Sequence, residues 1–261
     1  MIEWLPMNLS MTGALAATYR SGAQRARVVT ESWGESNLYC PNCSSPKLTW
    51  LEPGHPASDY SCPKCRFWFQ LKSQKSPIGK SITDGAYRAM MNAIRHDETP
   101  NFYFMQYELA TWRVKNLLLV PSFAFPPSAI IKRKPLSSTA RRAGWVGCNI
   151  ALNRVPAEAR IAVVTESAVI SASEVREKFK RVKPLENISV TQRGWTLDVL
   201  NAVRTLGKSE FTTADAYAFT RELERLHPDN RHVRDKIRQQ LQVLRDTGLL
   251  IHLGRGEWRL P

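Results

Sequence analysis

Four of the five cysteines fall in two closely spaced pairs, an arrangement typical of a zinc site. Each pair reads Cys-Pro-x-Cys and 18 residues separate the pairs; the four are Cys40, Cys43, Cys62 and Cys65. Two such turns can complete a tetrahedron of thiolates around Zn²⁺ and leave no open position for water. The pattern therefore predicts a structural zinc ribbon rather than a catalytic zinc. The alternative is four unrelated buried thiols, against which the shared spacing argues.

The second cysteine pair lies between two short segments that carry polar residues. The segment after it alternates, so that Phe67, Phe69 and Leu71 are expected to face a core, with Gln70 and Lys72 side by side on the other face. If Cys62 to Cys65 forms a hairpin turn, Asp59 lies on the neighbouring strand within reach of Gln70 and Lys72.

An Asp followed about ten residues later by a carboxylate or amide, and then by Lys two positions on, is the arrangement of the PD-(D/E)XK nucleases. Phosphodiester hydrolysis needs hard divalent cations held by oxygen ligands. Asp59 is the expected anionic Mg²⁺ ligand, with the Gln70 side chain and the Leu71 backbone carbonyl as further ligands. Lys72 is expected to orient the attacking water or to stabilise developing charge. A polar strand face with a solvated lysine is the alternative, because so short a pattern also occurs by chance.

A basic connection between later segments has a composition that suits nucleic acid. It contains basic residues, hydroxyls and a Trp between glycines, but no acidic residue; its candidate contacts are Arg133, Lys134, Arg141, Arg142 and Trp145. Cations of this kind contact phosphates, and an indole on a loop can stack on a base or wedge beside it. A solvated loop with the indole folded into the core stays an open alternative.

The C-terminal region reads as three helices followed by a small hairpin, which is the pattern of a winged helix. The helices are expected at 195–206, 213–226 and 230–247, and the hairpin at 249–260. Apolar positions and Gln240 gather on one side of the third helix. The opposite side carries Arg231, Arg234, Arg238, Gln242 and Arg245, residue types that read base edges in a major groove. The alternative is a solvated helix in a dimerisation module.

The rest of the chain supplies the elements that must position these residues. Helices are expected at 12–31, ending at Glu31, at 81–95 and at 173–181; buried strands are expected at 102–107, 117–120 and 161–165. Together they predict a mixed α/β fold with a first domain at 1–182 and a second at 183–261.

Composition narrows the function classes. The 261 residues include 37 Lys and Arg against 23 Asp and Glu, a net charge of +14, which favours a polyanionic partner but also fits a merely soluble basic protein. No apolar run is long enough to span a bilayer, and residues 1–6 lack the pattern of a secretory signal. We therefore expect a cytoplasmic protein without disulfides.

The sequence strongly resembles the DpnI-like, methyl-directed type II restriction endonucleases over nearly its whole length. The stretches that carry the resemblance are 39–43, 59–72, 84–87, 133–136, 139–149 (TARRAGWVGCN), 193–196 and 236–241. The resemblance implies a PD-(D/E)XK catalytic domain with an embedded four-cysteine zinc ribbon, followed by a winged-helix domain. It also implies Mg²⁺-dependent cleavage of double-stranded DNA at GATC sites with N6-methyladenine, with both domains recognising the site. Trp145 then becomes the expected methyladenine reader.

Gln70 departs from the family pattern, in which a Glu is expected. The exchange removes one negative charge and should weaken cation affinity, although Gln serves in other members of the nuclease superfamily. We expect a working monomeric nuclease without an obligate protein partner, with Glu31 as an additional acid. A catalytically weak or inactive methyladenine-DNA reader is the alternative. An RNA-binding zinc protein would leave the Asp59–Lys72 face and the winged helix unexplained.

Overall fold

The computed structural model describes residues 7–52 and 58–261, so residues 1–6, on which the absence of a secretory signal was judged, lie outside it. The chain packs as two compact units. The first comprises residues 1–79, 99–122 and 159–180, and the second comprises 80–98, 123–158 and 181–261. The domain limits expected from the sequence, 1–182 and 183–261, stay a prediction.

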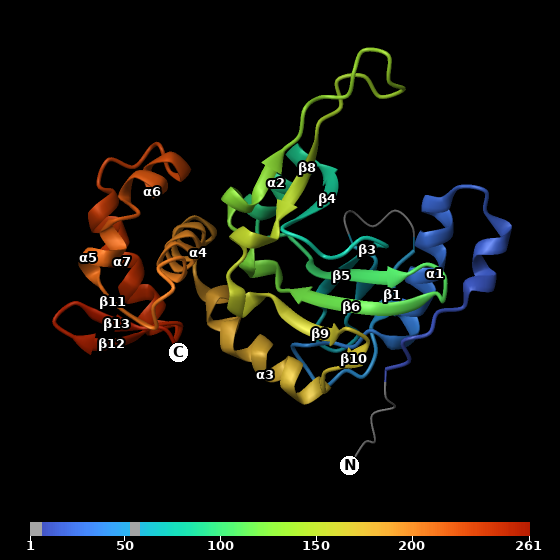
Figure 1. The fold of residues 1–261 in the computed structure, drawn as a ribbon, viewed down its shortest axis with the longest axis horizontal. Coiled ribbons are helices and arrows are strands. Elements are labelled where there is room, and N and C mark those ends of the chain that lie inside the picture. The colour runs from blue at the N-terminus through green and yellow to red at the C-terminus, as the bar shows by residue number, and fades with distance from the viewer. Residues whose placement is uncertain (1–6, 53–57) are drawn as a thin grey trace. The chain divides into compact units, whose positions relative to one another are not determined.

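The first unit is built on a mixed sheet (Figure 1). Within the described residues its seven strands lie in the order β1-β2-β3-β5-β6-β9-β10. Their bounds are β1 Thr49–Trp50, β2 Tyr60–Ser61, β3 Trp68–Gln74, β5 Asn101–Glu108, β6 Arg113–Val120, β9 Ile161–Thr165 and β10 Ala168–Val169. Strands β3 and β5 run parallel and the other neighbours antiparallel.

The centre of this sheet is apolar on both faces. Every residue of β5 except Glu108 is buried, and the rings of Phe102 and Phe104 stack with centroids 5.4 Å apart. A near-continuous apolar run is what a strand covered on both sides requires. The three expected buried strands are confirmed as β5, β6 and β9.

Two helices pack with this sheet, and the first differs from the expectation. Residues 12–31 form a 3-10 helix at Gly13–Thr18 and then the start of α1 (Gly22–Asn37), because Tyr19 and Ser21 have extended backbones. Glu31 therefore lies in the middle of α1 rather than at its end. The helix continues past it because a later turn buries Trp33. The second helix, α3 (Ala172–Val182), confirms the expected helix at 173–181.

The second unit contains a small sheet in the order β4-β8-β7 and helix α2 (Tyr87–Arg95). The strands are β4 Ser81–Ala86, β7 Ile130–Lys132 and β8 Gly147–Ala151. The expected helix at 81–95 is thus wrong over its first six residues. The β-branched Ile82 and Thr83 and the following Gly85 are weak helix formers, and pairing with β8 satisfies the backbone instead.

The C-terminal part of this unit has the expected helices followed by strands. Its helices are α4 Val190–Arg204, α5 Thr213–Tyr217, α6 Thr220–Leu226 and α7 Val233–Asp246. The expected helix at 213–226 is interrupted at Ala218 and Phe219. The hairpin is confirmed as β12 Ile251–Gly254 and β13 Glu257–Arg259, and β11 Glu210–Thr212 adds a third strand next to β13.

Short 3-10 helices link several of these elements: η1 Gly13–Thr18, η2 Ser122–Ala124, η3 Pro127–Ala129, η4 Leu152–Arg154, η5 Ala157–Ala159 and η6 Lys183–Asn187. No helix in residues 7–52 and 58–261 combines the length and apolarity that a membrane crossing needs. The fold is mixed α/β, as expected.

Candidate metal and nucleic-acid sites

The four paired cysteines converge on one point. Their sulfur atoms all lie within 4.8 Å of one another, with Cys40 to Cys65 and Cys43 to Cys62 each at 3.5 Å. A tetrahedral site with Zn–S bonds of about 2.3 Å has sulfur atoms about 3.8 Å apart, so the cluster fits Zn²⁺. All four ligands are thiols, which makes a closed, structural site the chemistry that this cluster supports.

Backbone hydrogen bonds in the turns favour thiolates, whereas burial opposes them and raises the pKa values of Cys40 and Cys43. Backbone N–H groups of Ser45 and Cys65 donate to the sulfurs of Cys43 and Cys62, both at 3.4 Å. Burial opposes ionisation of Cys62, but backbone N–H donors, that of Cys65 first, lower the pKa of its thiol to about 7. Burial raises the pKa of Cys40, so that thiol needs the metal ion to ionise it.

Arg176 of α3 holds the first cysteine turn, a role that the sequence analysis missed. Its Nε donates to the carbonyl oxygens of Cys40 at 3.1 Å and Cys43 at 2.9 Å. Its Nη2 donates to the Ser45 carbonyl at 3.3 Å. No local sequence signal connects it to the cysteines, because the contact spans more than 130 residues of chain.

Asp59 directly precedes β2 and is fixed by the neighbouring strand β3. Its backbone N–H donates to the Phe69 carbonyl at 2.9 Å, and its Oδ2 accepts from the Leu71 backbone N–H at 2.8 Å. The expected hairpin is therefore present, and the carboxylate lies against the middle of β3. Phe69 and Leu71 are buried while Gln70 and Lys72 are partly exposed, which confirms the alternation expected for this strand.

Lys72 follows Leu71 on β3, the strand whose backbone holds Asp59. Burial raises the pKa of Asp59 above its ordinary value. The Leu71 N–H group and the charges of Lys72 and Arg27 lower this pKa, but burial has the larger effect. The N–H and C=O groups of one strand residue point to the same side, so the Leu71 carbonyl is also directed toward the Asp59 side. The residues present fit a hard cation held by oxygens. The parts of Asp59, Gln70 and Leu71 in holding it, and that of Lys72 in catalysis, remain predictions.

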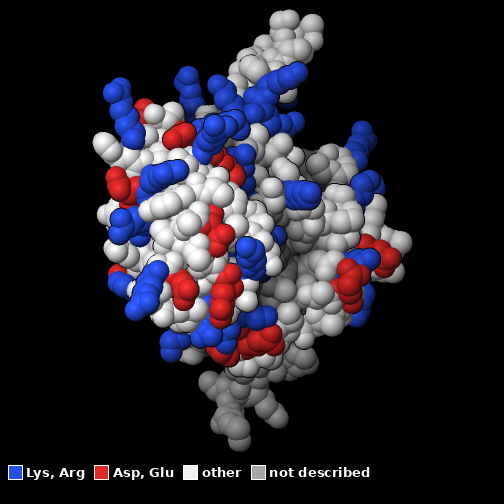
Figure 2. Space-filling model, turned by 60° about the vertical axis from the view of Figure 1, so that its left-hand side comes forward, with Lys and Arg blue, Asp and Glu red and all other residues white. Residues whose placement is uncertain are grey.

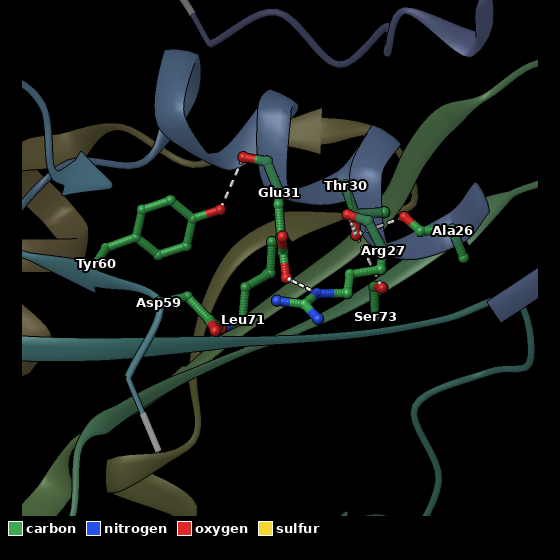
Figure 3. A network of polar contacts seen from close by, with 8 residues as sticks. All are labelled: Ala26, Arg27, Thr30, Glu31, Asp59, Tyr60, Leu71 and Ser73. Atoms are coloured by element: carbon green, nitrogen blue, oxygen red, sulfur yellow. Dashed lines mark hydrogen bonds and ion pairs between the residues drawn. The ribbon is translucent and has the colours of Figure 1, made fainter. Parts of the chain in front are cut away.

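A second carboxylate, Glu31, reaches this corner from α1 (Figure 3). Two hydrogen bonds tie the helix there: Tyr60 Oη donates to the Glu31 carbonyl at 2.8 Å, and the hydroxyls of Thr30 and Ser73 lie 3.0 Å apart. The close approach requires Gly34, because a Cβ at that position would collide with the Tyr60 hydroxyl. Burial, chiefly, and the Asp59 charge raise the pKa of Glu31.

Arg27 lies one helical turn before Glu31 and pairs with it. Its Nε is 2.7 Å from Glu31 Oε1. The guanidinium group and the carboxylates of Glu31 and Asp59 share the space between α1 and β3 in Figure 3. Sequence reasoning missed Arg27; its only local signal is the four-residue spacing from Glu31, which is common on solvated helices.

The basic connection forms an arm between β7 and β8. Backbone hydrogen bonds continue the hairpin past the strands, from Arg133 N–H to the Gly147 carbonyl at 3.0 Å and from Leu136 N–H to the Trp145 carbonyl at 2.9 Å. In Figure 1 the arm extends well beyond the end of β8. Its predicted contact residues with cationic side chains are all exposed: Arg133, Lys134, Arg141 and Arg142.

Trp145 sits at the base of this arm rather than in the core. The ring is half-buried and lies over Gly147, where a Cβ would collide with it. The guanidinium carbon of Arg142 lies 4.6 Å from the ring centroid. A rigidly seated indole beside a cation can offer a flat apolar surface to a base.

Helix α7 separates its two faces as expected. Val233, Ile237, Gln240, Leu241 and Leu244 are buried, and the Gln240 amide oxygen accepts from the Thr196 hydroxyl at 2.7 Å. The opposite face is exposed and carries Arg234, Arg238, Gln242 and Arg245; Arg231 is exposed too, but it precedes α7, which begins at Val233. The side that bears α5, α6 and α7 comes forward in Figure 2, where Lys and Arg side chains gather toward the upper edge.

Two family models match the chain. Residues 7–188 match the model described as the Dam-replacing family, and residues 191–260 match the Dam-replacing helix-turn-helix domain. The first match contains the cysteine cluster, the Asp59 corner and the basic arm. The second contains α7 and the C-terminal strands.

Proposed function

The chain belongs to the Dam-replacing family, and from that premise we propose that it is a type II, methylation-dependent restriction endonuclease. Its substrate is double-stranded DNA with N6-methyladenine in GATC, and the reaction is Mg²⁺-dependent phosphodiester hydrolysis. The observation that carries the proposal is the corner where the Asp59 carboxylate accepts a hydrogen bond from the Leu71 N–H group, with Lys72 as the next residue of β3. The protein acts as a monomer without an obligate protein partner.

Each residue of the corner has a chemical task in this proposal. Asp59 and Glu31 supply negative charge for the cation, and Gln70 and the Leu71 carbonyl supply neutral oxygens. Bound Mg²⁺ neutralises phosphate charge and makes water a better nucleophile. Lys72 orients the attacking water or stabilises the charge that develops on the phosphate. Gln70 is neutral where the family pattern has a carboxylate. Glu31 from α1 replaces that missing negative charge beside Asp59.

Digestion of methylated and unmethylated plasmid tests the proposal. With Mg²⁺ we expect the protein to cut plasmid from a methylating host and to spare plasmid from a non-methylating one. Equal cutting of both would contradict the methyl requirement. Asp59→Ala should lower cutting by about 100-fold or more, since one ligand and its charge disappear. Glu174→Gln, which loses an exposed ion pair with Lys178, is the matched control and should leave cutting unchanged.

A non-catalytic reader of methylated DNA is the second candidate, and Gln70 is the observation that favours it. It predicts tight binding to methylated duplex with no cleavage in Mg²⁺ or Mn²⁺. If the unaltered chain does not cut and the Gln70→Glu variant does, that result would support the non-catalytic reader. Cutting by the unaltered chain that Asp59→Ala abolishes would exclude it.

A further inference from the structure

A fixed positive charge already occupies the neighbourhood of the two carboxylates. The Arg27 Nε–Glu31 Oε1 pair is 2.7 Å long, and the Arg27 side chain is 62% exposed while that of Glu31 is 20% exposed. The guanidinium group thus reaches from solvent onto a mostly buried acid. It can withdraw along its exposed side without opening a cavity.

Arg27 lies close to both acids. Its guanidinium group pairs with Glu31 and shares the space between α1 and β3 with the Asp59 carboxylate (Figure 3), so its charge attracts both, whereas the two carboxylates repel each other. Thr30 and Tyr60 keep α1 in place on either side of this group, so Glu31 cannot relieve the repulsion by moving the helix away. Two carboxylates held this way need a cation before any metal arrives.

We propose that Arg27 is a placeholder cation, which balances Glu31 and Asp59 in the metal-free protein and is displaced when a divalent cation binds them. The inference rests on the proposed function, because the displacing ion is the one that the nuclease would use. Arginine suits this role since its charge is permanent at any physiological pH, so it adds to the charge of Lys72 whenever no metal ion is bound. The Arg27 guanidinium group also competes with the metal ion. Because the ion must displace this group from Glu31, the apparent metal affinity is lower.

The test measures metal binding without DNA, using the full-length, zinc-containing protein and Mn²⁺ as the probe. Electron paramagnetic resonance reports free Mn²⁺ during titration. Arg27→Gln should bind Mn²⁺ about twofold to fivefold more tightly than the unaltered chain, the range expected for one partly exposed charge. It should also lower the thermal midpoint of the metal-free protein and enlarge the rise in that midpoint when Mn²⁺ is added.

Three control variants sharpen the result. Arg25→Gln removes the same charge from the same helix, but its side chain bonds to the Tyr19 carbonyl, so Mn²⁺ affinity should stay unchanged. Arg27→Lys keeps the charge and should restore the weaker affinity. Asp59→Asn should abolish Mn²⁺ binding at the site of Asp59 and Glu31. This variant therefore shows which part of the measured binding belongs to that site.

The outcomes separate this inference from the proposed function. Unchanged or weaker Mn²⁺ binding by Arg27→Gln overturns the placeholder role, and so does an unaltered chain that binds no Mn²⁺ at this corner. Tighter binding by Arg27→Gln in a protein that never cuts methylated DNA would support the placeholder role and reject the nuclease.

Discussion

Trp145 is the residue whose position bears most directly on methyl recognition. A methyl group contributes only about 0.8 kcal/mol when buried, so a large preference for N6-methyladenine requires a surface that holds the base in one orientation. The ring is fixed over Gly147 and beside Arg142. Such a seat restricts the indole before DNA arrives, which reduces the entropy lost on stacking.

Replacing this indole should affect methylated substrate more than unmethylated substrate. Base stacking on an aromatic ring contributes about 1–3 kcal/mol, so Trp145→Ala should weaken binding to methylated GATC duplex by about tenfold. Fluorescence anisotropy with matched methylated and unmethylated duplexes measures the change. Trp145→Phe, which keeps an aromatic face, should recover part of the preference. An equal loss on both duplexes would show that the ring supports the arm without reading the methyl group.

The residues of the two candidate metal sites differ in how visible they are in the sequence. The cysteines converge as expected because each pair is local and the pairing of β1 with β2 brings the two pairs together. Asp59 and Leu71 meet because one short hairpin pairs β2 with β3. Arg27 and Arg176 were missed because helix–sheet and helix–turn packing brings them in from distant segments, and neither carries a spacing that identifies its partner.

At the scale of elements, the zinc ribbon is the part of the first unit that depends on a metal. Its two turns bury Cys40 and Cys62, and Arg176 holds the first turn through backbone carbonyls. Metal binding to a preformed thiol site contributes folding free energy. Purified protein should contain one zinc per chain by elemental analysis, and removal of zinc with a chelator should lower the thermal midpoint. Cys65→Ser should lose the zinc, whereas Cys148→Ser, altered outside the cluster, should keep it.

Helix α5 begins at a capping box that should give the second unit an acid-sensitive contribution. Thr212 Oγ1 accepts from the Asp215 N–H at 3.1 Å, and Asp215 Oδ2 accepts from the Thr212 N–H at 2.7 Å. The Thr212 N–H, then its hydroxyl, lower the pKa of Asp215. A carboxyl group with a lowered pKa stabilises the fold above its unfolded value near 3.9, and the contribution disappears as the pH falls through the folded pKa.

Substitution at the box should therefore show a defined pH dependence. Thr212→Ala should cost about 1 kcal/mol of unfolding free energy at neutral pH, as losses of N-caps do. Asp215→Asn should destabilise at neutral pH but approach the unaltered chain as the pH falls below the ordinary carboxyl range and through the lowered pKa of Asp215, where that chain loses the same contribution. Urea unfolding at several pH values measures both. Asp229→Asn, outside the box, should keep the acid-side slope of the unaltered chain.

The sequence predicted those helices and strands whose residue periodicity determines their structure. It did not predict the strands that form only because a distant strand pairs with them. The buried faces of β5 and α7 follow from their residue patterns. Residues 81–86 form a strand only because β8 pairs with them, and β11 forms only beside β13. Neither partner is visible from the local sequence, so tertiary pairing overrides propensity at both places.

For the whole molecule, the net charge of +14 means that salt must control DNA binding. Each phosphate neutralised by a Lys or Arg releases counterions, so the logarithm of the affinity falls linearly with the logarithm of the salt concentration. The arm and the exposed face of α7 both present Arg side chains to solvent. Their side chains should therefore contribute to the slope, or to sequence preference, according to what they contact.

Arg238 on the exposed face of α7 distinguishes these two contributions. If its guanidinium group contacts a phosphate, Arg238→Gln should weaken binding similarly on all duplexes and reduce the salt slope by about one. If it contacts a base edge, the substitution should cost about 1–3 kcal/mol on the GATC duplex and little on an unrelated one. Since α7 holds the position that a recognition helix occupies, we expect the second result.

Titrations of both duplexes between low and moderate salt measure the effect of Arg238→Gln, with the exposed Arg20→Gln in the first unit as the charge-matched control. The Arg238→Gln variant could also bind both duplexes with unchanged affinity and an unchanged salt dependence. That result would contradict a place for Arg238 in the DNA interface.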